Sequence, residues 1–175
     1  MSSGATLRGS ALLFVAAMLQ AVIVSSLVFG GGAPDLLLVV VVSLGLLRGS
    51  IPGAVFGFAG GLVVDLLTLE TLGITSLVLT LAGFWAGRYA ETSGRSRQLA
   101  PILAVGVITV LAASFALVLH YMLGEQIVVR HALVTALAPA LVANLVLALP
   151  VYALVRELVQ RRGDLEAARE VEVVV

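Results

Sequence analysis

Apolar residues occur along this chain in six long runs, separated by short polar or glycine-rich segments. The runs cover residues 11–29, 34–47, 51–69, 73–89, 99–123 and 132–158. A helix needs about 20 apolar residues to cross the hydrocarbon core of a bilayer, and glycine, proline and charged residues at the junctions are typical of tight turns. The pattern predicts an all-α integral membrane protein, with a six-helix transmembrane domain over residues 1–160 and a short cytoplasmic tail over 161–175.

The second run is the shortest, with roughly 14 apolar residues against the usual ~20. We expect it to be short, tilted or partly shielded by its neighbours. Asp35 stands where the first turn of a helix needs a capping acceptor, and Arg48 stands where a cation favours the helix C-terminus. Local electrostatics explains both residues without a ligand.

Composition supports the bilayer as the solvent of this chain. Of its residues, 61% are hydrophobic and 11% are charged, and the formal net charge is zero. A neutral chain has no long-range attraction for nucleic acid, so nucleic-acid binding is disfavoured. Cysteine is absent, which excludes disulfides and thiolate chemistry, and the two histidines could not alone build an ordinary zinc site. We therefore expect no metal and no cofactor.

The arginines predict an orientation, because the chain contains no lysine. With a cytoplasmic N-terminus, every arginine except Arg130 faces the cytoplasm, which is a strong positive-inside bias. Both termini are then cytoplasmic in a multi-pass membrane protein. Arg8 before the first run would also suit a secretory signal, but the run is longer than an ordinary signal core.

Small residues recur every four positions on three of the predicted helices. The third run carries Gly49, Gly53, Gly57 and Gly61, the fourth carries Gly83 and Gly87, and the sixth carries Ala136, Ala140, Asn144 and Ala148. Rows of this kind let helix backbones approach closely. They favour the third, fourth and sixth helices as the packed centre of the protein. Packing inside the protein is the simpler explanation of these rows, and a groove for a partner is the alternative.

Asp65 continues the glycine row of the third run and is costly inside a membrane, by roughly 2.5 to 3.5 kcal/mol at a helix centre. It therefore needs a partner or a wet cavity. Counting along the helix places Asp65 in the outer leaflet, where Thr75, Ser76 or His120 could donate to it and where Asp35 should also lie. We expect a structural use for Asp65, since a proton relay would need acids at several depths.

Asn144 lies near the middle of the sixth run between Pro139 and Pro150. Proline frees backbone carbonyls inside a helix, so a local hydrogen bond is the simplest role for its amide. The sequence contains no His-Glu-x-x-His, no Gly-x-Ser-x-Gly, no P-loop and no facing pair of aspartates within the membrane. Enzyme activity is therefore not expected.

An ordered series of short motifs resembles the rod shape-determining protein MreD family. The matching segments are Pro34-Asp35-Leu36-Leu37-Leu38, Leu46-Leu47-Arg48-Gly49, Gly53 to Gly57, Gly61-Leu62-Val63-Val64-Asp65-Leu66-Leu67, Leu72-Gly73 and Gly83-Phe84-Trp85-Ala86-Gly87-Arg88. They cover residues 34–88, about a third of the chain, while the first, fifth and sixth runs agree only in hydrophobicity, length and number.

The resemblance implies a non-enzymatic inner-membrane subunit of the bacterial cell-elongation machinery. It implies binding to MreC, work alongside MreB, RodA and a class B penicillin-binding protein, and support of lateral peptidoglycan synthesis and cell shape. It also implies a six-helix fold similar to the S components of vitamin transporters, which by itself carries no ligand.

Two functions from different classes follow. In the first, glycine-packed helices form a rigid scaffold and a groove receives part of MreC. In the second, the chain is a small-molecule-binding subunit of a vitamin-type transporter, with Asp35, Asp65 and His120 at the base of an outward cavity. Few polar groups converge there, and ligand pockets usually combine aromatic with polar side chains, so the scaffold is favoured.

Overall fold

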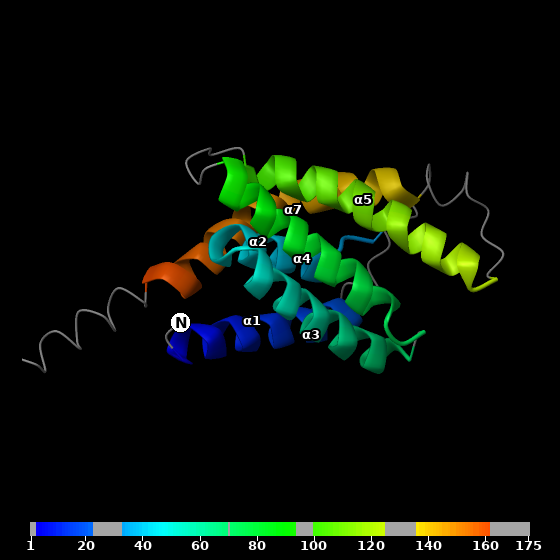
Figure 1. Cartoon of the computed structure of the whole chain (residues 1–175), viewed down its shortest axis with the longest axis horizontal. Coiled ribbons are helices and arrows are strands. Elements are labelled where there is room, and N and C mark those ends of the chain that lie inside the picture. Colours follow the sequence, from blue (N-terminus) through cyan, green and yellow to red (C-terminus); the bar gives the residue numbers. More distant parts are fainter. Residues whose placement is uncertain (1–2, 23–32, 70, 94–99, 125–135, 162–175) are drawn as a thin grey trace, which may run out of the picture.

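Six α-helices, one on each of the apolar runs, make up the described part of the chain. In a computed structural model, the described residues are 3–22, 33–69, 71–93, 100–124 and 136–161. The helices are α1 (Ser3–Val22), α2 (Leu36–Arg48), α3 (Ser50–Thr68), α4 (Ile74–Ser93), α5 (Ala100–Met122) and α7 (Ala138–Arg156), which continues as the π-helical turn η3 (Glu157–Arg161). Successive helices alternate in direction, so α1 begins and η3 ends at the same end of the bundle (Figure 1).

The centre of the bundle is α2, which corrects the expectation that the sixth helix would lie there with the third and fourth. All ten residues from Leu37 to Leu46 are buried, and α2 contacts α1, α3, α4, α5 and α7. A helix that is apolar on every side has no face for water and is buried all round. Thirteen residues extend only about 20 Å, so α2 is short and shielded, as the length of its run predicted.

The sixth helix, α7, lies at the periphery instead. Its buried residues are Asn144, Ala148, Val151 and Val155, while Ala140 in its first turn and Ala136 just before it are only half-buried. The small-residue row of this helix therefore packs over its second half and leaves space beside its first half. Small residues permit close packing, but only where a neighbouring backbone is present to use the space.

The glycine rows of α3 and α4 face each other inside the protein. A Cβ atom on Gly53, Gly57 or Gly61 would collide with the α4 backbone at Gly83, Leu79 or Ser76, respectively. A Cβ on Gly87 would likewise collide with the backbone at Gly49 and Ser50. The rows are thus used for internal backbone-to-backbone packing, and they do not form an open groove.

Gly49 makes the sharp junction between α2 and α3. Its φ of +99° lies in the region that only glycine adopts without strain, and its N–H closes the last turn of α2 on Gly45 O at 2.8 Å. One residue therefore ends one helix and precedes the next, which holds α2 and α3 in a tight antiparallel hairpin.

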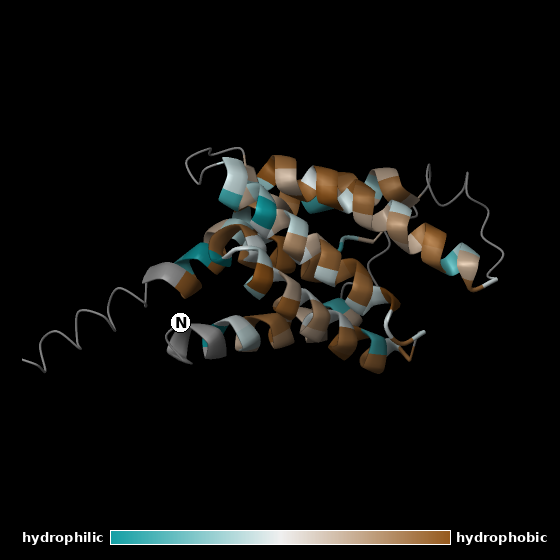
Figure 2. Ribbon diagram, viewed as in Figure 1, coloured by the Kyte–Doolittle hydropathy of each residue, from teal (hydrophilic) through white to brown (hydrophobic). Residues whose placement is uncertain are grey.

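Large apolar side chains cover the outer surface of the bundle. Ile51, Val55, Leu111 and Val146 are each more than half exposed, and Figure 2 shows hydrophobic residues along most of the helices. Three helices are long and apolar enough to cross a membrane: Ser50–Thr68, Ala100–Met122 and Ala138–Val159. The apolar parts Arg8–Val22 and Leu36–Arg48 are shorter. On this criterion, the described residues support three of the six expected spans.

Candidate functional site

The start of α2 is held by three side chains in the interior of the bundle. Asp35 accepts a hydrogen bond from Leu38 N at 2.8 Å, as predicted for a capping residue. Asn144 Oδ1 accepts from Asp35 N at 2.7 Å, and Gln20 Oε1 accepts from Leu36 N at 2.8 Å. The first N–H groups of a helix have no partner within it, and away from water each needs one. Three of these N–H groups are satisfied here.

Gln20 was missed by the sequence reasoning. Its Nε2 also donates to Pro34 O at 3.4 Å, so its amide contacts both backbone groups at the entry to α2. The available signal was its position, because it is a polar amide within the apolar run 11–29. An amide at such a position is costly unless it has partners.

Asn144 joins three helices, which corrects the local hydrogen bond expected from the neighbouring prolines. Besides accepting from Asp35 N, it donates through Nδ2 to Thr109 Oγ1 at 3.2 Å on α5. Asn144 and Thr109 are almost fully buried. The single amide therefore links α7 to the start of α2 and to the middle of α5.

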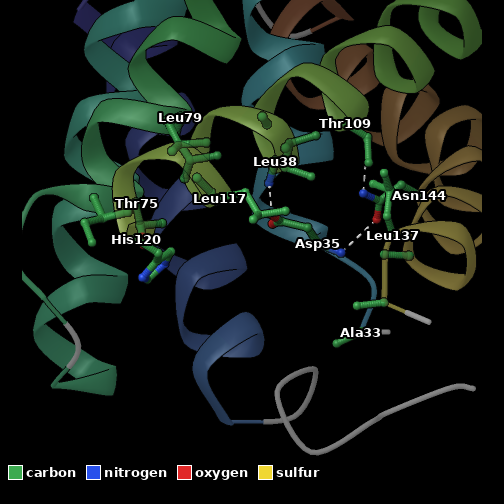
Figure 3. A pocket seen from close by; sticks show the side chains of 17 residues that line it. Ala33, Asp35, Leu38, Thr75, Leu79, Thr109, Leu117, His120, Leu137 and Asn144 are labelled. Atoms are coloured by element: carbon green, nitrogen blue, oxygen red, sulfur yellow. Dashed lines mark hydrogen bonds between the residues drawn. The ribbon is translucent and has the colours of Figure 1, made fainter. Parts of the chain in front are cut away.

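A partly open cavity of about 480 Å³ lies against this polar layer, between α2, α4, α5 and α7. Most of its wall consists of alanine and leucine, and its polar lining residues are Asp35, Thr75, Thr109, His120 and Asn144. Figure 3 shows Asp35 between His120 on one side and Asn144 on the other. No neighbouring backbone fills the space beside the alanines of α5 and α7, so the cavity remains. The space beside the glycines of α3 is filled by the α4 backbone.

Asp65 lies outside the lining of this cavity and is fully buried at the α3–α4 hairpin. Its Oδ2 accepts from Gly73 N at 2.8 Å, from Ser76 N at 3.4 Å and from Ser76 Oγ at 3.3 Å. Of the three donors expected from the sequence, Ser76 is confirmed. Thr75 and His120 line the cavity with Asp35 instead, so the expected layer of Asp35, Asp65 and His120 is divided between two places.

The second oxygen of Asp65, Oδ1, is buried with no hydrogen-bond partner within the described part of the chain. The residue nevertheless has a clear structural use. Its carboxylate ties the turn before α4 and the first turn of α4 back to α3. The glycine row that ends at Gly61 is thereby continued by a polar link between the same two helices.

At the opposite end of α3, a carboxylate from α4 caps the helix. Gly49 precedes α3 and has no side chain to cap it, and Glu91 Oε1 accepts from Ser50 N at 2.8 Å and Ser50 Oγ at 2.9 Å. Hydrogen bonds from the Ser50 backbone and hydroxyl lower the pKa of Glu91 from its ordinary value. Arg88 Nη1 contacts Glu91 Oε2 at 3.3 Å, which places the predicted residue Arg88 at this cap.

Glu91 was also missed by the sequence reasoning. It lies 41 residues from Ser50, and no local pattern predicts a cap supplied by another helix. Gly49 and Gly87 allow the approach, since a Cβ on Gly49 would come within 2.9 Å of Glu91 Oε1. Arg48, which we predicted to stabilise the C-terminus of α2 through its positive charge, lies in the last turn of that helix.

A lateral apolar groove of about 440 Å³ lies between α1 and α3. Its lining includes the small residues Ala17, Ala59 and Gly60 and the large apolar residues Phe14, Ile51 and Val55. Ile51 and Val55 are largely exposed. A surface that combines small residues with large apolar side chains suits a helix packed against it in lipid.

Comparison with protein families decides the relationship of this chain. The sequence model of the family described as rod shape-determining protein MreD matches residues 4–162, nearly the whole chain. The chain belongs to the MreD family. No curated protein and no solved structure matches it, so the expected likeness to S components has no support from the comparisons.

Membership in the MreD family confirms the resemblance drawn from residues 34–88 and extends it to the first, fifth and sixth runs. It implies a role in determining rod shape and a location in the membrane, which agrees with the three long apolar helices. The residues of the resemblance are those at the α2–α3–α4 centre, including Asp35, Gly49, Gly57, Asp65 and Gly83.

Proposed function

We propose that this MreD-family protein is a non-enzymatic scaffold of the cell-elongation complex, which binds MreC and thereby supports lateral peptidoglycan synthesis. The family match over residues 4–162 carries the proposal. In this account, MreB, RodA and a class B penicillin-binding protein are engaged indirectly, through MreC. The glycine-packed α2–α3–α4 centre supports a scaffold, because tightly packed interiors resist deformation and hold a surface in one shape.

We further propose that the protein crosses the inner membrane several times, with both termini in the cytoplasm. Arg8 near the start of α1, Arg48 at the end of α2, Arg88 near the end of α4 and Arg156 at the end of α7 belong to helix ends that lie together (Figure 1). A cluster of arginines at one end is typical of the cytoplasmic side. Asp65 and the α3–α4 hairpin then lie toward the outside.

The α1–α3 groove is the surface that we propose for the transmembrane helix of MreC. Its lining runs along α3 from Ile51 to Val63, a length of about 18 Å, which would engage three turns of a partner helix. The small residues Ala59 and Gly60 in this lining let a second backbone approach closely. The glycine row of α3 cannot serve this purpose, because α4 already occupies it.

Co-purification tests this proposal. The full chain and tagged MreC from the same genome are co-expressed, extracted in mild detergent and separated by gel filtration. We expect a stoichiometric complex that Ala59→Phe removes, because the ring occupies the groove where the partner helix would pack. Val146→Phe is the matched control, since Val146 is 70% exposed on α7, away from the groove, and should leave the complex intact.

Two results would count against it. A complex that survives Ala59→Phe would move MreC to another surface, and failure of the wild-type chain to co-purify would contradict MreC binding itself. The alternative of a vitamin-type transporter subunit is less favoured, because the family that matches the chain is one of rod shape-determining proteins.

A further inference from the structure

The cavity beside Asp35 is unlike the other packed regions of the bundle. It combines a volume of about 480 Å³ with a carboxylate, two threonines, an imidazole and an amide on an otherwise apolar wall. Ligand sites in proteins are typically concave, mostly apolar and provided with a few polar groups, at volumes of about 300–1,000 Å³. The cavity therefore has the size and the chemistry of a binding site.

The polar groups of the floor are not equally available to a ligand. Asn144 donates to Thr109 and accepts from Asp35 N, which uses one donor and the acceptor of its amide. Asp35 uses one oxygen for Leu38 N, and its carboxylate lies at the cavity between His120 and Asn144 (Figure 3). A carboxylate within a membrane needs a partner or water, so the cavity group with the strongest requirement for a partner is the hydrogen-bond acceptor Asp35.

We propose that this cavity binds a small molecule or lipid headgroup that carries an alkylammonium group. The ammonium donates to Asp35 Oδ2, the oxygen that does not bind Leu38 N, and the carbon chain lies on the alanine wall of α5 at Ala112 and Ala116. A cation gives this oxygen a charged donor, and hydrogen bonds between ionised groups are stronger than those between neutral groups. This inference rests on the cavity alone, and it is independent of MreC binding.

The size of the wall agrees with a short chain. Thr109, Ala112, Ala116 and His120 line the cavity from one side of α5, and the 11 helical steps from Thr109 to His120 extend about 16 Å. Across the cavity, Thr75 and Leu79 of α4 supply the opposing surface. A compact amine with a ring or a chain of a few carbons fits between these walls, with its ammonium at the α2 end.

Calorimetric titration of the full chain in phosphatidylglycerol nanodiscs tests the proposal. Phenethylamine is the probe, phenylethanol is its neutral counterpart, and empty nanodiscs correct for partition into lipid. We expect the amine to bind about tenfold more tightly than the alcohol, since a hydrogen bond to a charged donor exceeds a neutral one by roughly that factor. Equal affinity for the two probes, or no binding of the amine, would overturn the proposal.

Two variants assign the binding to this cavity. Asp35→Asn keeps the cap of α2, because asparagine caps helices as well as aspartate does, but it removes the charge. The affinity for the amine should fall to that for the alcohol. Ala116→Phe places a ring in the cavity from α5 and should remove the binding of both probes. Unchanged amine binding in these two variants would place the probe elsewhere and overturn the assignment.

The source of the ammonium group can be read from the same titration. Nanodiscs that contain phosphatidylethanolamine present the group on a lipid, and competition from this lipid would weaken the apparent affinity for phenethylamine. In that case, the natural ligand is an aminophospholipid headgroup. An affinity that does not change with phosphatidylethanolamine identifies a water-borne amine instead.

Discussion

Two halves of this bundle use small residues in opposite ways. In α3 and α4, glycines face each other so closely that the backbones are in contact and no side chain could be added. In α5 and α7, alanines at comparable spacing line a cavity of about 480 Å³. Small residues therefore do not by themselves predict tight packing, and the deciding factor is whether a neighbouring backbone occupies the space.

The polar groups follow the same division. Asp65 is enclosed in the tight half and ties α3 to α4, while Asp35 lies at the edge of the open half. The tight half has the character of a rigid scaffold, and the open half has the character of a site that can accept a ligand. Proteins commonly combine a rigid framework with more adaptable binding regions.

The largest expected effect comes from adding one methyl group to the tight half. Gly57→Ala should lower the free energy of unfolding by about 3 kcal/mol, because overpacking against a backbone forces α3 and α4 apart. Gly106→Ala is the matched change in the open half, where the added Cβ would meet only the Leu145 side chain at 3.3 Å. Unfolding in mixed micelles should show a loss for the first variant and none for the second.

Replacing Asp65 should have the next largest effect. Asp65→Leu leaves Gly73 N–H and the Ser76 donors without their acceptor, at a cost of about 2 kcal/mol. Asp65→Asn keeps an acceptor oxygen, so its loss of stability should be smaller. If the asparagine variant folds and supports rod shape normally, the charge of Asp65 has no role, and its hydrogen bonds alone matter.

The hydrogen bonds of Asn144, which join the two halves, should contribute less to stability than Gly57 or Asp65. Asn144→Leu removes the bonds to Asp35 N and Thr109 and should cost about 1 kcal/mol. A double-mutant cycle with Thr109→Val should give an interaction energy of about 0.5 kcal/mol, which is typical of residues in direct contact. Strictly additive losses would show that the Asn144–Thr109 bond does not couple α7 to α5.

The smallest effect concerns Glu91 and depends on pH. Its pKa is lower in the folded chain than its ordinary value of 4.5, so its stabilising effect is present above pH 4.5. That effect is lost as the pH falls through the lowered value. Glu91→Gln should flatten the acid limb of a thermal-stability profile, and an unchanged limb would contradict the cap on α3.

The sequence predicted the elements of this fold better than their arrangement. Hydrophobic runs locate all six helices, and Asp35 is identified as a cap because its acceptor lies three residues from the N–H it binds. The central place of α2 was missed, although its uniform apolar character was visible, because short length suggested a marginal helix. The glycine spacing was read correctly as close packing, and its partner backbone in α4 appeared only in three dimensions.

The candidate site was less predictable, because its contacts join distant parts of the chain. Asn144 binds Asp35, which is 109 positions away, and Thr109, which is 35 positions away. Glu91 caps a helix that begins 41 residues earlier. No spacing rule along one helix reports such pairs. The Asp35, Asp65 and His120 layer was inferred from depth alone, and depth does not distinguish which side of α4 a side chain occupies.

Cell shape tests the central claim that this chain acts as a scaffold through its α1–α3 groove. The native protein is depleted, and variants present at equal membrane levels are scored by the length-to-width ratio of the cells. We expect rounded cells after depletion, rods with the wild-type chain or Val146→Phe, and rounded cells with Ala59→Phe. Rods that persist after depletion, or that return with Ala59→Phe, would contradict it.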